Sequence, residues 1–210
     1  MGDASFTTYL VDDDPDVLRS ITRLLKAGGY KTESFSSPRK FLLAHDPSVP
    51  GCAIIDLVMS ELDGLSLQEA LAKTGSRRPI IFLTGRGDVS TGVRAMKAGA
   101  VDFLTKPVKR DTLFSAIAHA AELDAASRQE RQESKSIDDR LGTLTHRERE
   151  VLEHVIAGRL NKQIAASLGT VEKTIKVHRG RMMAKLGIRS VAELVRLADR
   201  AGISPASGES

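Results

Sequence analysis

Cys52-Ala53-Ile54-Ile55-Asp56-Leu57-Val58-Met59 is the stretch that decides the fold, because an unbroken apolar run ends on a single carboxylate. Apolar residues without alternation are typical of a strand buried on both faces of a parallel sheet. Asp56 would then lie at the carboxyl end of that strand, and this edge is where open α/β sheets bind ligands. An Asp after a strand is also a common turn or cap residue, so the rest of the chain must decide what Asp56 does.

Further segments repeat the pattern of a strand followed by a helix. Strands are expected at 8–11, 31–35, 79–84 and 101–105, and helices at 15–27, 39–44, 64–73, 89–98 and from 111 onward. Together with the strand at Asp56 they make five β/α units. The arrangement predicts an α/β fold with a doubly wound, five-stranded parallel sheet, in which the carboxyl ends of all strands lie on one edge.

Polar residues stand at the carboxyl ends of four of these strands. Asp12 and Asp13 follow the first strand, Asp56 ends the third, Thr84 ends the fourth, and Lys106 follows the fifth. Because these ends share one edge, we expect the five side chains to converge on one crevice.

About residues 6 to 122 resemble the receiver domain of bacterial response regulators, which has a flavodoxin-like fold. The resemblance rests on Asp12-Asp13, Asp56 with Met59 and Gly64, Thr84, and Lys106-Pro107. The family has Met-Pro after the aspartate, and this chain has Met59-Ser60.

The charges of the crevice indicate a metal site. Three carboxylates in one place carry −3, and a hard divalent cation such as Mg²⁺ together with the Lys106 ammonium brings the sum to zero. The resemblance implies that Asp12, Asp13 and Asp56 form the Mg²⁺ site. It also implies that Asp56 is the nucleophile that takes a phosphoryl group from a histidine of a sensor kinase, with Lys106 and Thr84 as its catalytic partners.

Phosphorylation replaces a −1 carboxylate by an acyl phosphate of roughly −2, and Thr84 and Lys106 are placed to bind the new oxygens. The resemblance implies that Thr84 moves inward and that Phe103 fills the vacated space. Val58 and Arg86 are at positions that flank the attacking water in receivers. Since Val58 has no group to hydrogen-bond water, we expect slow loss of the phosphoryl group.

Basic residues are concentrated in the last third of the chain. Residues 1–124 carry 16 acidic and 15 basic residues, residues 125–142 carry 4 of each, and residues 143–210 carry 7 acidic and 12 basic residues. A small domain with a net charge of +5 favours nucleic acid as its partner.

Four short helices are expected between 143 and 201, which makes a compact all-α domain. Thr145 and Glu148 form a capping box before the first helix, and Asn161 is expected to cap the second. A third helix is expected at 172–186 and a fourth at 190–201.

The C-terminal segment resembles the LuxR-type helix-turn-helix domain. The matching residues are Leu144-Thr145-Arg147-Glu148, Asn161-Lys162-Gln163-Ile164-Ala165, Thr174-Ile175-Lys176-Val177-His178 and Lys185-Leu186. The third helix would enter the major groove of double-stranded DNA. The expected DNA-binding residues are Lys162, Lys173, Thr174, Lys176, Val177, Arg179, Arg181 and Lys185.

Within that set, Lys176 and Val177 are the candidates for base edges, and Lys162, Thr174, Arg179, Arg181 and Lys185 are better placed for phosphates. Two residues depart from a well-formed recognition helix. Val171 stands where the family has a capping Ser, which costs about 1 kcal/mol. Gly180 in the helix interior costs about another 1 kcal/mol relative to Ala.

We therefore expect a receiver domain at 1–122, a charged helical linker at 123–142, a helix-turn-helix domain at 143–203 and a disordered tail at 204–210. The linker is charged throughout, which favours a solvated helix. A coiled seam has weak support, because only Ile137, Leu141 and Leu144 are spaced for one.

The complete pattern resembles a response regulator of the FixJ/NarL class, which is a transcription factor and not an enzyme. The resemblance implies a sensor histidine kinase, double-stranded DNA and RNA polymerase as partners, and a homodimer after phosphorylation. A single cysteine and the lack of a membrane-length apolar run favour the cytoplasm, with no membrane partner.

Two alternatives stay open on the sequence alone. The first is a receiver-like module that is switched by a protein or ligand without phosphorylation. The second is a phosphohydrolase of the haloacid dehalogenase type, because Asp12-x-Asp14 superficially resembles the nucleophile motif of those enzymes. That motif requires Thr or Val where Asp16 stands, and it leaves the basic C-terminal domain unexplained.

Overall fold

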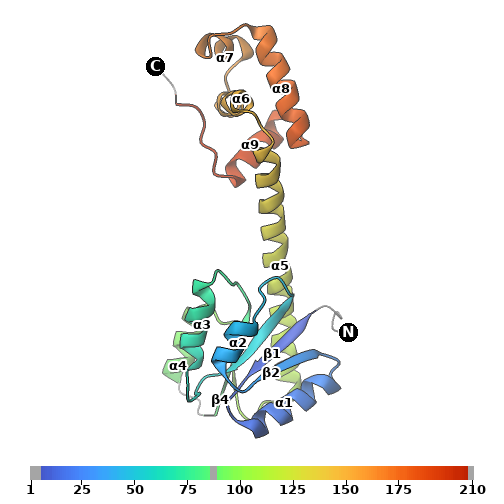
Figure 1. The fold of residues 1–210 in the computed structure, drawn as a ribbon, viewed down its shortest axis with the longest axis vertical. Coiled ribbons are helices and arrows are strands. Elements are labelled where there is room, and N and C mark those ends of the chain that lie inside the picture. The colour runs from blue at the N-terminus through green and yellow to red at the C-terminus, as the bar shows by residue number, and fades with distance from the viewer. Residues whose placement is uncertain (1–5, 86–88, 208–210) are drawn as a thin grey trace. The chain divides into compact units, whose positions relative to one another are not determined.

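The structure is a computed structural model that describes residues 6–85 and 89–207 (Figure 1). The chain divides into two compact units, Met1–Arg128 and Gln129–Ser210. In the described part of the chain, no helix combines the length and the apolar character that crossing a membrane requires.

The first unit is a five-stranded sheet flanked by helices. Its elements are β1 (Thr7–Val11), α1 (Pro15–Ala27), β2 (Lys31–Phe35), α2 (Pro38–Ala44), β3 (Gly51–Asp56), α3 (Gly64–Lys73), β4 (Ile80–Thr84), α4 (Val89–Lys97), β5 (Asp102–Thr105) and the first part of α5 (Arg110–Gly142). All strand pairs are parallel and their order is β2-β1-β3-β4-β5. The predicted doubly wound sheet is confirmed.

The buried strands alternate their side chains between two apolar cores. On β3, Ile54 points into the core shared with α1 and α5, and Ile55 points into the core shared with α2, α3 and α4. Both residues are fully buried. Because helices cover both faces of the sheet, the strand ends are the places where polar side chains gather in this unit.

A polar network ties α5 to the loop before β3. Asp124 is buried, and its carboxylate accepts hydrogen bonds from Gly51 N (3.2 Å) and from Arg128 Nε (2.7 Å). The Arg128 guanidinium also donates to the carbonyls of Ser48 (2.7 Å) and Val49 (2.6 Å). The helix is thus held to the first unit as far as Arg128, beyond the position at which the linker was expected to begin.

The second unit is all α. It consists of the last part of α5 with α6 (His146–Ile156), α7 (Asn161–Ser167), α8 (Glu172–Leu186) and α9 (Val191–Arg200). Its single apolar core is built from all of these helices. Ile137 and Leu144 are buried in this core and Leu141 packs against it, so these residues stabilise the unit instead of forming a coiled seam.

The helix ends in this unit confirm one predicted cap and correct another. Thr145 and Glu148 form the predicted capping box. The cap predicted at Asn161 is wrong, because α7 begins at this residue and Leu160 is the N-cap. Gln163 Oε1 accepts from Leu160 N (2.8 Å), and the Asn161 side chain instead accepts from Arg179 Nη1 (3.2 Å).

The tail after α9 has a fixed contact in its described part. Residues 204–207 have no regular secondary structure, yet Ala206 N donates to the carbonyl of Glu153 on α6 (3.1 Å). Ser207 O also accepts from Arg159 Nη2 (3.0 Å). The expectation of a disordered tail is therefore corrected for these residues, and 208–210 lie outside the described chain.

Candidate functional site

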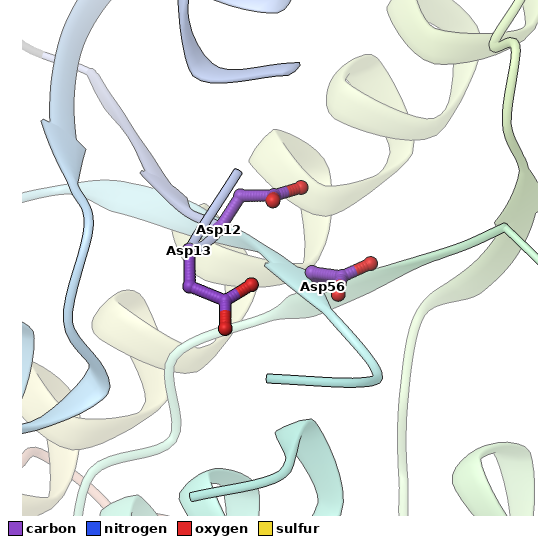
Figure 2. A group of neighbouring side chains, drawn as sticks. All are labelled: Asp12, Asp13 and Asp56. Atoms are coloured by element: carbon purple, nitrogen blue, oxygen red, sulfur yellow. The ribbon is translucent and has the colours of Figure 1, made fainter. Parts of the chain in front are cut away.

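Three aspartates meet at the carboxyl edge of the sheet. Asp12 and Asp13 follow β1, and Asp56 is the last residue of β3, which is the neighbour of β1 (Figure 2). One carboxylate oxygen from each residue lies within 4.8 Å of the others. Asp12 and Asp56 are buried and Asp13 is exposed, so the group has one side open to solvent.

Lys106 is the cation of this group. Its Nζ lies 2.6 Å from Asp12 Oδ2 and 2.7 Å from Asp56 Oδ1, and the residue before it ends β5. The backbone N–H of Lys106 donates to the carbonyl of Thr84 at the end of β4 (2.7 Å). The three aspartates and Lys106 thus converge as parallel strand ends predict, and Thr84 reaches them through its backbone carbonyl.

Backbone donors hold the three carboxylates in place. Asp14 N donates to Asp12 (2.9 Å), and Val58 N donates to Asp56 (3.2 Å). Ser60 N donates to Asp13 Oδ2 (2.7 Å). This last contact was not predicted from the sequence, although Ser60 supplies an N–H that the family's proline would lack.

Burial and neighbouring charges act in opposite directions on the pKa values of Asp56, which is buried, and Lys106, which is partly buried. Burial raises the pKa of Asp56, although the hydrogen bond from Lys106 works to lower it. Burial by itself would lower the pKa of Lys106, but the hydrogen bonds to Asp12 and Asp56 outweigh it and raise this pKa. The ammonium therefore keeps its charge at neutral pH.

The donor set of the crevice fits a hard divalent cation. Oxygen atoms of three carboxylates converge, one of them on an exposed side chain, and oxygen is the ligand that Mg²⁺ prefers. With Lys106 already present, the residual charge of the group is −2. A cation of charge +2 would neutralise it.

The expected switch residues lie on neighbouring strands. Thr84 is buried at the end of β4, and Phe103 on β5 is partly buried against the core that faces α4. A Cβ atom built at Gly92 on α4 would lie 3.3 Å from the Phe103 ring, so the ring packs closely on this helix. Val58 is 73% exposed beside Asp56, and Arg86 lies outside the described residues.

The second unit presents most of the predicted DNA-binding side chains to solvent. Lys162 on α7 is exposed, as are Lys173, Lys176, Val177 and Arg181 on α8. Thr174 and Arg179 are partly buried. Val171 is the N-cap of α8 and makes no side-chain capping bond, as its apolar side chain predicts.

Lys185 does not have the position expected of a phosphate contact. Its ammonium lies 2.6 Å from Glu148 Oε2 and donates to the carbonyl of Thr143 (3.0 Å). Glu148 is only 2% exposed, so Lys185 neutralises a buried carboxylate within the unit. The capping box signalled that Glu148 caps α6, but nothing in the sequence placed the end of α8 beside it.

Comparison with known proteins matches both units to families. The response regulator receiver domain matches residues 9–118, and the luxR family of bacterial regulatory proteins matches residues 142–198. Nodulation protein W of Bradyrhizobium diazoefficiens is 40% identical over 196 residues, which cover 93% of this chain and 86% of that protein. Transcriptional regulatory protein FixJ of Azorhizobium caulinodans is 38% identical over 204 residues, 96% of each chain.

A solved structure agrees with these relatives. The response regulator StyR matches with a TM-score of 0.85 and 41% identity, covering 94% of this chain and 100% of that one. Relatives such as FixJ are named transcriptional regulatory proteins, and the two family matches are a receiver domain and a regulatory DNA-binding family, so the phosphohydrolase alternative is set aside. The chain belongs to the response regulators in which a receiver domain is joined to a LuxR-type helix-turn-helix domain.

Proposed function

We propose that a sensor histidine kinase phosphorylates Asp56 and that this modification switches DNA binding by the C-terminal domain. The observation that carries the proposal is the Lys106 ammonium, which bridges Asp12 and Asp56 at hydrogen-bond distance. A partly buried lysine that joins two carboxylates beside a third is a group of charges arranged for an anionic substrate.

We infer that Asp12, Asp13 and Asp56 hold Mg²⁺. Bound there, the metal ion supplies charge neutralisation for the phosphoryl donor and for the group in transfer. The exposed Asp13 carboxylate lies on the solvent side of the group, where a hydrated cation can arrive without crossing the core.

The side chains of the crevice have distinct parts in phosphoryl transfer. A carboxylate oxygen of Asp56 forms the bond to phosphorus while the bond from phosphorus to the histidine nitrogen of the kinase breaks, which leaves an acyl phosphate on Asp56. Lys106 keeps a positive charge next to the product, whose charge is roughly −2. Val58 N holds the carboxylate in orientation through its 3.2 Å hydrogen bond.

The output of the receiver passes through Thr84 and Phe103. Thr84 is buried at the end of β4, where its carbonyl accepts from Lys106 N, and its hydroxyl is the group that would turn toward the phosphoryl oxygens. Phe103 would move into the space that Thr84 leaves. Its ring is only partly buried and packs against Gly92 on α4, so its movement would be felt by that helix. The surface formed by α4 and β5 would thereby change shape.

The DNA-binding residues are proposed to be Lys162, Lys173, Thr174, Lys176, Val177, Arg179 and Arg181. Phosphorylation would favour a homodimer that places two copies of α8 on paired half-sites, because linking two modules raises their effective concentration. The regulator would then act on RNA polymerase at the promoter, in the cytoplasm where the chromosome lies.

The test compares wild type with Asp56→Asn, with and without acetyl phosphate and Mg²⁺. DNA binding and molecular mass by light scattering are measured together. We expect only the phosphorylated wild type to dimerise and to bind more tightly. Equal binding by both proteins would leave the helix-turn-helix function standing and would remove Asp56 as its control.

A further inference from the structure

Gly180 in the middle of α8 has no explanation within the domain. Glycine in a helix interior lowers helix stability relative to alanine. Gly180 has ordinary helical backbone and is not among the glycines with positive φ. Among the described residues, a Cβ atom added there would have no neighbour within 4 Å outside its own helical turn. Neither backbone conformation nor packing therefore requires a glycine here.

The position of Gly180 on the helix shows which way this missing side chain would point. Ile175, Met182 and Leu186 are the buried residues of α8 and mark its core side. At 3.6 residues per turn, Gly180 lies on the other side of the helix, together with Lys173 and Val177. All three are exposed, and Val177 retains 45% of its accessible surface.

We propose that Gly180 is a specificity-determining residue, because it lets the α8 backbone approach the DNA duplex more closely than any side chain would allow. The inference rests on the proposed DNA-binding function of this helix. Glycine is the residue used where backbone must come close to a ligand, and local rules of helix design are broken mainly at functional sites. The approach seats Val177, one turn earlier, against the base edges, where its methyl groups match the C5-methyl of thymine.

This contact belongs to the specific complex alone. Non-specific binding depends on attraction between cations such as Lys173 and the phosphates, which does not require close contact between backbone and bases. An added side chain at position 180 would therefore weaken the specific complex and leave non-specific binding unchanged. The chain thus gives up helix stability for discrimination between DNA sequences.

The experiment uses the full-length chain with acetyl phosphate and Mg²⁺. A duplex is first selected by wild type from a random-sequence 30-base-pair pool, and a scrambled duplex serves as non-specific DNA. Gly180→Ala and Gly180→Leu are then measured on both duplexes and by thermal unfolding. We expect Gly180→Ala to raise the midpoint of unfolding and to bind the selected duplex about fivefold to tenfold more weakly, and Gly180→Leu about a hundredfold more weakly.

Ala192→Leu is the matched control, because it adds a side chain to an exposed position on another helix, α9, and should not change affinity. The salt dependence of binding should also stay constant, since no charge changes. Full affinity for the selected duplex in the more stable Gly180→Ala variant would overturn the proposal. If wild type selects no duplex, DNA binding itself fails, and that result is distinct from retained affinity in the variant.

Discussion

The ion pair between Lys185 and Glu148 allows a quantitative prediction. Glu148 Oε2 accepts from Lys185 Nζ (2.6 Å) and from Thr145 N (2.9 Å), and this carboxylate side chain is 3% exposed. Lys185→Met keeps the apolar stem but leaves the buried carboxylate without its cation. Breaking a buried pair costs about 3–5 kcal/mol. Because the Lys185 side chain is 35% exposed and water can replace it in part, we expect Lys185→Met to lower the free energy of unfolding by about 2–3 kcal/mol.

The same ion pair makes the loss of stability in Lys185→Met depend on pH in a defined direction. The hydrogen bond from Lys185 lowers the pKa of Glu148 from its ordinary value of 4.5. A lowered folded-state pKa contributes stability above pH 4.5, and that stability is lost as the pH falls through the folded-state value. The difference between wild type and Lys185→Met should therefore be greatest near neutral pH and should shrink as the pH falls below 4.5.

Hydrogen exchange and DNA binding together decide whether Lys185 is a structural residue. We expect amides of α6 and α8 to lose protection in Lys185→Met, and the salt dependence of DNA binding to keep its slope. Arg181→Met is the control, because loss of one phosphate contact lowers that slope by about 0.9 without loss of protection. A lowered slope with full protection in Lys185→Met would refute the reasoning and restore Lys185 as a phosphate contact.

Three more predictions concern the receiver. Val58→Asn places a hydrogen-bonding group beside Asp56 and should speed loss of the phosphoryl group about tenfold, measured as its half-life; an unchanged half-life would contradict the expected role of position 58. His45 accepts a hydrogen bond from Arg78 (2.8 Å), and burial lowers its pKa to about 4, so stability should fall as the pH drops from 7 to 5. His45→Gln should remove about 1 kcal/mol of that dependence, after allowance for the partial exposure of the ring, in urea titrations at both pH values. Arg128→Ala should lower the free energy of unfolding of the receiver by about 2–3 kcal/mol in calorimetry, because the buried Asp124 carboxylate loses the cation paired with it, and a loss below about 0.5 kcal/mol would argue against the network.

The acidic group could be predicted from sequence because each of its members depends on a local pattern. An apolar run fixes β3, and the parallel connection fixes which end of the strand carries Asp56. The order of the elements also places Lys106 after β5. The convergence depends only on the order of strands and helices, so an error of one residue at a strand end does not change it.

Contacts between helices could not be predicted in this way. The charges of Lys185 and Lys162 look alike in sequence, yet Lys185 lies against Glu148 and Lys162 is exposed. The difference depends on which turn of α8 packs on the start of α6, and several rotations of an amphipathic helix satisfy the same apolar pattern. For the same reason the sequence favours a solvated helix around Ile137, with only weak support for a seam, whereas the residue belongs to a core.

The geometry of Lys106 also limits how phosphorylation can act. A modification shifts an equilibrium between two conformations only through contacts that differ between them. Lys106 is already hydrogen-bonded to Asp12 and Asp56, so the phosphoryl group gives it a stronger acceptor at a place where it already lies. We therefore expect Lys106 to stabilise the product in both conformations. In the proposed switch, the movement of Thr84 would supply the contact that distinguishes the two conformations, and the coupling to α4 would depend on the Phe103 ring, which packs on that helix. On this proposal, Lys106 would determine how stable the phosphorylated state is, and Thr84 would determine how that state changes the surface of the receiver.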